Sequence, residues 1–459
     1  MRSAIRFFVA VIVLALVTGT AAEKPIDDDL ASETLELAEQ VGLWIANSSV
    51  RTAEGTVWPD DALNPEVVSY DLASGVAGKV LFFIALYRAT ENPDYLELAL
   101  GGADYLVTTL NDPGVFEGNQ RRASLYSGIS GIGVALAHVQ PYARQEKYEV
   151  AIEKVSSLLS EWGIVDERGL HWSDEFNDLL FGDAGTILYL SWHAERTRDV
   201  RALALAHRGA QFLLSEAADA AVGKFWYFRR SKLFNLPNFS HGTAGVAYVL
   251  ATVGAQVSDE SLRLGAQAGF DYIRSIAEIE DDILRIPYGW GSDAWDGLYE
   301  FGWAHGLTGT ISFFVRLQQT GIDAESASEY ERMSRHTLQN IGLPNTPARP
   351  FAEPATSLDV RFGRAGVLSL ASDWSVDDSA SDEGTALRND LWSHIARAAI
   401  RDERTAHWEI DAPEFMGGER AAYTGIFHGA AGMGLAILRM HARISGVRPY
   451  VDMPDNPIE

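Results

Sequence analysis

The sequence contains no cysteine, and this absence removes several kinds of chemistry at once. No disulfide can stabilise the fold, no thiolate can act as a nucleophile, and no thiolate can bind a metal ion. A lipid anchor on a cysteine is excluded for the same reason. The hydrophobic core must hold the fold by itself, and with 47% hydrophobic residues in a chain of 459 that core can be large.

Positive charge is also scarce. The chain has 37 basic residues against 63 acidic ones, a formal net charge of −26. A surface of this sign repels nucleic acid and anionic membranes. We therefore expect no nucleic-acid partner.

Long hydrophobic runs are nearly absent, and the one that exists lies at the start of the chain. Arg2 and Arg6 precede an apolar run over Phe7–Val17, and small residues follow up to Ala22. This order is typical of a secretory signal peptide, and the run is shorter than the roughly 20 residues of a spanning helix. We expect cleavage after Ala22, a single domain over 23–459 and a secreted or periplasmic protein without stable membrane insertion. An uncleaved anchor is the alternative.

What the sequence does contain is a Gly-x-x-Gly motif repeated seven times, at intervals of 53 to 66 residues. Residues that are apolar on almost all sides follow each motif, as expected of a buried helix, and amphipathic segments lie between the motifs. The leading glycines are Gly75, Gly128, Gly182, Gly242, Gly306, Gly363 and Gly429. The amphipathic segments are Ala31–Ser48, Asp94–Leu110, Lys147–Trp162, Val200–Glu216, Glu260–Ile279, Ser326–Ile341 and Glu383–Asp402. The pattern predicts an all-α fold with seven buried helices in an inner ring and seven amphipathic helices around it.

In such a closed ring all inner helices begin at one face. Glycine in the first turn lets the crowded backbones approach closely and permits unusual backbone angles. The amino-terminal ends of the helices, with unpaired N–H groups and partial positive charge, then converge on a central funnel. The side chains just before each leading glycine are predicted to line it.

Three of these positions hold histidine, in a chain that has only 11 histidines. They are His241, His305 and His428. Histidine transfers protons near neutral pH and also binds metals, so all three are candidate catalytic residues. Asp183 begins the third inner helix and is a candidate for orienting one of them.

The motifs "SHGTAG", "WAHGLTG" and "FHGAAG" in the fourth, fifth and seventh repeats resemble the lanthionine synthetase C-like (LanC-like) family. The resemblance covers nearly the whole chain after the signal segment and implies an α/α toroid of seven inner and seven outer helices. It also implies a zinc ion that activates a peptide cysteine for addition to a dehydrated serine or threonine. In this resemblance His241 matches a histidine thought to transfer protons.

The sequence departs from the family at the zinc ligands. The family uses two cysteines and a histidine, and this chain has Ala304 and Phe427 where the cysteines stand. Only His428 of the three ligands remains. We therefore expect no zinc, no other cofactor and no lanthionine cyclase reaction.

The favoured hypothesis is an exported, zinc-independent LanC-like protein that binds or modifies a peptide or peptidic small molecule in the central funnel. Whether it catalyses a reaction or only binds is left open. The candidate substrate-binding residues are Trp303, Arg364, Trp290 and Tyr288.

Two other hypotheses compete with it. Aromatic and acidic residues concentrate in Arg285–Gly306, as in carbohydrate-active enzymes or sugar-binding toroids, where aromatic rings stack on sugars and paired carboxylates hydrolyse glycosides. These residues are Tyr288, Trp290, Trp295, Asp296, Glu300 and Trp303. The other hypothesis is an altered metal site in which His305 and His428 are joined by His241 or a carboxylate.

Overall fold

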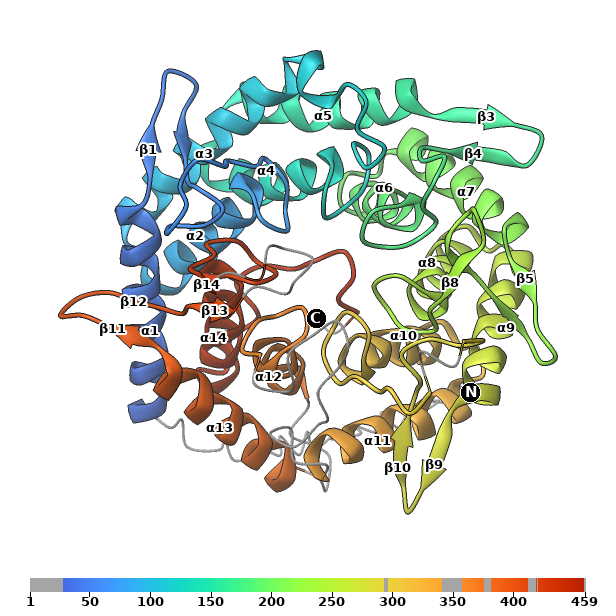
Figure 1. Ribbon diagram of the computed structural model, residues 1–459. Helices are drawn as coiled ribbons and strands as arrows, with labels where there is room; N and C mark the ends of the chain where they lie inside the picture. Colours follow the sequence, from blue (N-terminus) through green and yellow to red (C-terminus); the bar gives the residue numbers. More distant parts are fainter. Residues whose placement is uncertain are drawn as a thin grey trace, which may run out of the picture.

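Two concentric rings of helices make up the structure, a computed structural model that describes residues 28–292, 296–340, 357–374, 381–411, 418 and 420–457. Fourteen α-helices lie in these residues, seven in the inner ring and seven in the outer ring (Figure 1). The predicted all-α toroid is confirmed. The predicted signal peptide lies outside the described residues.

Each inner helix begins directly after the leading glycine of a repeat. In α8 the first twelve residues are all buried, as its apolar sequence predicts. The inner helices are α2 (Val76–Thr90), α4 (Ile129–Ala143), α6 (Asp183–Thr197), α8 (Thr243–Val257), α10 (Leu307–Thr320), α12 (Arg364–Asp373) and α14 (Ala430–Ile444).

The outer helices bury one face each and pack mainly on the inner helix that precedes them in the chain. The first outer helix instead packs on the last inner helix, α14, which closes the ring (Figure 1). Several begin with a side-chain cap: Asp199, for example, accepts hydrogen bonds from two backbone N–H groups of the first turn. The outer helices are α1 (Asp28–Asn47), α3 (Pro93–Leu110), α5 (Glu146–Trp162), α7 (Val200–Ser215), α9 (Glu260–Ile276), α11 (Ala324–Asn340) and α13 (Ser381–Ala398).

Short antiparallel hairpins, which the sequence patterns did not predict, connect the helices; several project from the outer edge (Figure 1). A 3₁₀ turn, η1, covers Pro113–Phe116. The paired strands are β1 (Val50–Arg51) with β2 (Thr56–Val57), β3 (Ile164–Asp166) with β4 (Gly169–His171), β5 (Ala218–Asp219) with β6 (Lys224–Phe225), β7 (Tyr227–Arg229) with β8 (Leu233–Asn235), β9 (Glu278–Glu280) with β10 (Ile283–Arg285), β11 (Ile400–Arg401) with β12 (Ala406–His407), and β13 (Ile410–Asp411) with β14 (Arg420–Ala421).

The paired glycines allow close backbone contact where the inner helices begin. A Cβ atom on Gly242 would lie 1.6 Å from the carbonyl oxygen of Leu236, and one on Gly245 would lie 2.0 Å from that of Phe239. The φ of Gly242 is −143°, in the extended region that any residue adopts. Close approach, and not an unusual backbone angle, therefore explains these glycines.

The end of the toroid opposite the glycines is closed by the C-terminal segment, residues 446–457, which runs to the middle of the ring (Figure 1). Asp452 accepts hydrogen bonds from His138 and from the indole of Trp192, on the carboxyl-terminal halves of α4 and α6. Asp455 accepts one from the hydroxyl of Tyr126, at 2.8 Å. The predicted funnel residues lie at the other end, where the inner helices begin. None of the helices within the described ranges is long and apolar enough to cross a membrane.

Candidate active site

The loops that precede the inner helices are tied to one another by backbone hydrogen bonds. The residues concerned stand two positions before the leading glycines. Ala73 donates to Tyr126, Leu180 to Ser240, Ser240 to Ala304, Ala304 to Arg361, Arg361 to Phe427 and Phe427 to Ala73, with N–O distances of 2.9–3.2 Å. These six bonds join seven loops into one series that runs from Leu180 to Tyr126, and they fix the next residue of each loop, which in three repeats is histidine.

His241 forms a buried pair with Asp178. Its Nδ1 lies 2.6 Å from Oδ2 of Asp178, and its Nε2 lies 3.2 Å from Nη2 of Arg361. Because a guanidinium can only donate, Nε2 is the acceptor, and the ring proton belongs on Nδ1, facing Asp178. Burial lowers the pKa of His241 well below its ordinary value, and the positive charges of Arg361 and Arg121 lower it further. The result is a neutral imidazole held in one tautomer, as a general base requires.

His428 forms a second pair of the same construction with Asp359, with 2.8 Å between Nδ1 and Oδ2. Both aspartates also accept a hydrogen bond from the backbone N–H three residues later. In sequence, each aspartate stands four positions before the leading glycine of one repeat, and its histidine one position before that of the next. Asp178 and Asp359 were missed by the sequence analysis, although this register marks both.

His305 lies between the two pairs. Its ring centroid is 5.1 Å from that of His241 and 4.6 Å from that of Tyr288. On the other side, Phe362 separates it from His428, with centroid distances of 6.1 Å and 5.7 Å. The structure thus brings the three predicted histidines together, with Tyr288 beside them. We call this group, with Asp178, Asp359 and Arg361, the histidine face.

Asp183 takes another role. It is buried at the start of α6, accepts hydrogen bonds from the backbone N–H groups of Trp172 and Ser173, and pairs with Arg230. The expectation that it orients a histidine is replaced by the observed contact of Asp178 with His241. Asp183 instead fastens the segment after β4 to the inner ring.

The other predicted binding residues are dispersed. Arg364 is buried at the start of α12, and the charge that acts on it is Asp390 of the outer helix α13. Trp303 packs inside, 5.3 Å from Tyr126 and 5.4 Å from Phe427 between ring centroids. Trp290 is 47% exposed, on the segment between β10 and α10. The predicted sugar-stacking residue Trp295 lies outside the described residues.

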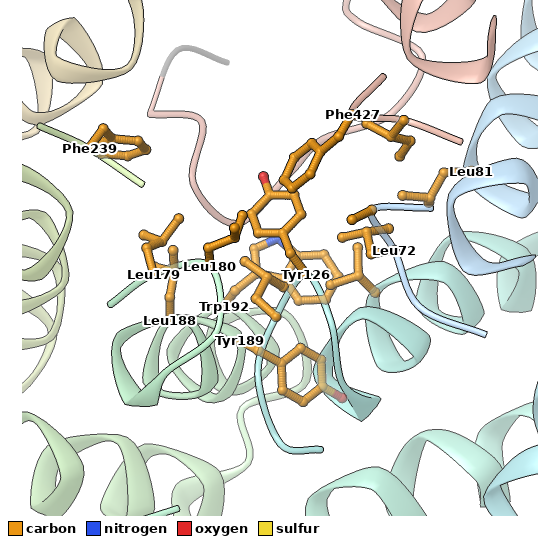
Figure 2. Packing of buried hydrophobic residues seen from close by; sticks show 14 of the residues in the cluster. Leu72, Leu81, Tyr126, Leu179, Leu180, Leu188, Tyr189, Trp192, Phe239 and Phe427 are labelled. Carbon is orange, nitrogen blue, oxygen red and sulfur yellow. The ribbon is translucent and has the colours of Figure 1, made fainter. Parts of the chain in front are cut away.

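The residues at the family's zinc positions do not fit zinc. Ala304 is buried and has no ligand atom, and the Phe427 ring packs 4.7 Å from that of Tyr126, in the middle of the toroid (Figure 2). The altered metal site predicted around His305 and His428 is not supported either. Across the parts of the chain that the structure describes, no group of three or more His, Asp or Glu side chains could hold a metal ion.

Comparisons with known proteins agree with this architecture. A family model described as lanthionine synthetase C-like protein matches residues 66–347, more than half of the chain. Nisin cyclase has a similar structure, with 14% identity, a TM-score of 0.58, and coverage of 92% of this chain and 96% of that one. A sugar epimerase from a ruminal bacterium is similar at 12% identity and a TM-score of 0.50, over 91% of this chain and 100% of that one.

At these identities the solved structures bear on the fold alone. No curated protein matches the sequence significantly. The family model, the seven repeats and the toroid lead to one assignment: the chain belongs to the lanthionine synthetase C-like family and lacks the cysteines of its zinc site.

Proposed function

We propose that this protein binds a peptide or peptidic small molecule at the histidine face and transfers a proton with His241, without zinc. The observation that carries the proposal is the His241–Asp178 pair, with 2.6 Å between Nδ1 and Oδ2 and the lone pair of Nε2 facing Arg361. Burial raises the pKa of the Asp178 carboxyl to about 8. A neutral imidazole backed by this group can act as a general base, because the ionised carboxylate stabilises the imidazolium that forms when a proton is accepted.

Family membership is the reason for favouring a peptidic ligand over a sugar. The thioether-forming reaction is not part of the proposal, because Ala304 and Phe427 cannot hold the ion that activates a thiolate. We also place the protein outside the cytoplasm, on the strength of the signal pattern that ends at Ala22. The ligand would then be an exported or extracellular peptide.

The experiment separates binding from proton transfer. A panel of short peptides is titrated against the protein by calorimetry, and the peptides that bind are incubated with it in D₂O and analysed for carbon-bound deuterium by mass spectrometry. The variant is His241→Asn, which keeps a polar side chain but cannot act as a base. His193→Asn is the matched control, since His193 is an equally buried histidine of an inner helix outside the histidine face.

We expect His241→Asn to keep its peptide affinity and to lose deuterium incorporation by about 10²-fold or more, with the control unchanged. Equal incorporation by the wild type and His241→Asn would contradict the proton-transfer role. Binding of neutral oligosaccharides and of no peptide would contradict the peptidic ligand and favour a carbohydrate function.

A further inference from the structure

Arg361 lies in the middle of the series of backbone hydrogen bonds that joins the loops. Its carbonyl accepts from Ala304, and its N–H donates to Phe427, at 2.9 Å and 3.2 Å. In the sixth repeat it therefore holds the same position that Ala304 and Phe427 hold in the repeats on either side. A cationic side chain is thus set between the two residues that stand in place of the family's zinc ligands.

The guanidinium of Arg361 is turned toward the histidine face. It lies 4.7 Å from the ring centroid of Phe362 and donates from Nη2 to His241. Asp359, Glu300 and Asp178 are near enough to affect its pKa, yet no carboxylate of the described residues lies within the 4 Å of an ion pair. Its buried Nε has no hydrogen-bond partner there either. Among the described residues, the one hydrogen bond of the guanidinium is the bond from Nη2 to His241, and its charge is not balanced by an ion pair.

Arg121 is a second cation beside the same base. Its guanidinium lies 3.9 Å from the ring centroid of Phe181, which itself packs against His241. It too has no ion-pair partner within the described ranges, and its charge acts on both His241 and Asp178. Arg361 donates to Nε2 of His241, and Arg121 stacks on the Phe181 ring that packs against the same histidine. Two positive charges thus lie near one base, and an anionic ligand would neutralise them.

We propose that Arg361, assisted by Arg121, binds a carboxylate of the ligand, and that His241 removes the proton from the carbon next to it. A carboxylate fits a guanidinium through two parallel hydrogen bonds, a geometry that a lysine cannot reproduce. The inference rests on the proposed function, since it names the group that the peptidic ligand must carry. The substrate class is a peptide with a free carboxylate at the reacting residue.

The proton transfer balances without a further reactant. The C–H bond breaks, the proton goes to Nε2 of His241, and the electron pair moves into the carboxylate, whose extra negative charge Arg361 stabilises. The proton then returns from Nε2 to carbon, so the net result in D₂O is exchange of that hydrogen. Binding of the anion also draws the guanidinium away from Nε2 and frees the lone pair that accepts the proton.

The test compares peptides that differ only in charge at one group. Each peptide that binds is prepared with a free C-terminal carboxylate and as its amide, and both forms are titrated against the wild type, Arg361→Gln, Arg361→Lys and the control Arg122→Gln. Arg122 is adjacent to Arg121 and lies over Trp162 instead of the histidine face. Thermal unfolding of every variant verifies that it is folded. Oligosaccharides of hexuronic acids are titrated in a separate series, because they carry a carboxylate but no peptide bond.

We expect the wild type and Arg122→Gln to bind the acid about 10- to 100-fold more tightly than the amide. Arg361→Gln should abolish this preference, and Arg361→Lys should restore part of it. Equal binding of acids and amides by the wild type would overturn the carboxylate inference and leave the proposed function standing. Binding of hexuronates through Arg361, with no peptide bound, would support the carboxylate and overturn the peptidic ligand. A preference that survives in a folded Arg361→Gln variant would overturn the role of Arg361.

Discussion

At the scale of the residue, position within the repeat decides which side chains reach the site. The three histidines could be recognised from the sequence, because each stands directly before a leading glycine. Their partners were missed because the contacts span repeats: His241 meets Asp178 from 63 positions earlier, and His428 meets Asp359 from 69. The position that both aspartates share in their repeats marks them in the sequence, but it points to the contact only when the loops of neighbouring repeats are known to bond to one another.

The pH dependence of proton transfer should respond to Arg361. Its positive charge lowers the pKa of His241, so Arg361→Gln should raise that pKa. A base is active when unprotonated, and the acid limb of the pH–rate profile should therefore move to higher pH in the variant. The pKa of His241 can be followed directly by NMR through the chemical shift of the proton on Cε1 of its ring. An unchanged His241 pKa in Arg361→Gln would mean that the guanidinium does not act on the base, and Arg122→Gln serves as the control.

A single methyl group on an inner-helix glycine should be destabilising. In Gly245→Ala the new carbon would meet the carbonyl of Phe239, and we expect a loss of about 1–3 kcal/mol in unfolding free energy, the usual range for overpacking. Gly114→Ala, at an exposed position of η1, is the control and should change it little. Urea denaturation measures both. Equal stability of the two variants would show that close packing does not explain the glycine pairs.

At the scale of the element, the helices could be predicted and the hairpins could not. The inner and outer helices have long apolar or amphipathic patterns, whereas strands of two or three residues are too short to show alternation. The hairpins nevertheless matter for packing. After three of them a buried tryptophan donates its indole N–H to a carbonyl of the preceding outer helix. The pairs are Trp172 with Leu159, Trp226 with Leu213, and Trp408 with Ile395.

The hydrogen bond from the indole of each buried tryptophan to the outer helix should contribute measurably to stability. Trp226→Phe removes the donor and leaves the buried carbonyl of Leu213 without it, so we expect a loss of about 1–3 kcal/mol in unfolding free energy. Trp290→Phe, at a side chain that is 47% exposed, is the matched control and should be nearly neutral. If denaturation curves of Trp226→Phe overlay those of the wild type, the hairpins are not fastened to the outer ring in this way.

At the scale of the whole molecule, the two ends of the ring differ: the histidine face lies where the inner helices begin, and the C-terminal segment packs on the opposite end. The seven repeats predict the toroid, and the Pro- and Asp-rich composition of Arg448–Glu459 predicts a tail on its surface. The structure instead draws part of that segment inward, where Pro454 and Asp455 are buried and Asp455 bonds to Tyr126. The partners of this segment come from several inner helices, and a contact of this kind leaves no pattern in the sequence of the segment itself.

The packing of the C-terminal segment on the inner helices should depend on pH, because Asp452 must be ionised to hold it. Burial alone would raise the pKa of Asp452, but its contacts with His138 and Arg196 hold it well below the ordinary value. A lowered carboxylate pKa adds stability above the unfolded-state value of about 3.9, and this stability is lost as the pH falls further. The protection of residues 446–457 against hydrogen exchange, relative to the intrinsic rate at each pH, should therefore fall below about pH 4. Asp452→Asn should show fast exchange already at neutral pH, and equal protection in the variant and the wild type would contradict this anchoring role.

The central claim is that a LanC-like toroid works here without the zinc of its family. The most direct test is the metal content of the purified full-length protein by elemental analysis, together with its proton-exchange activity before and after treatment with a chelator. We predict far less than one zinc per chain and an activity that the chelator leaves unchanged. One tightly bound zinc per chain, lost together with activity on chelation and restored with it, would contradict the account and return the histidine face to metal chemistry.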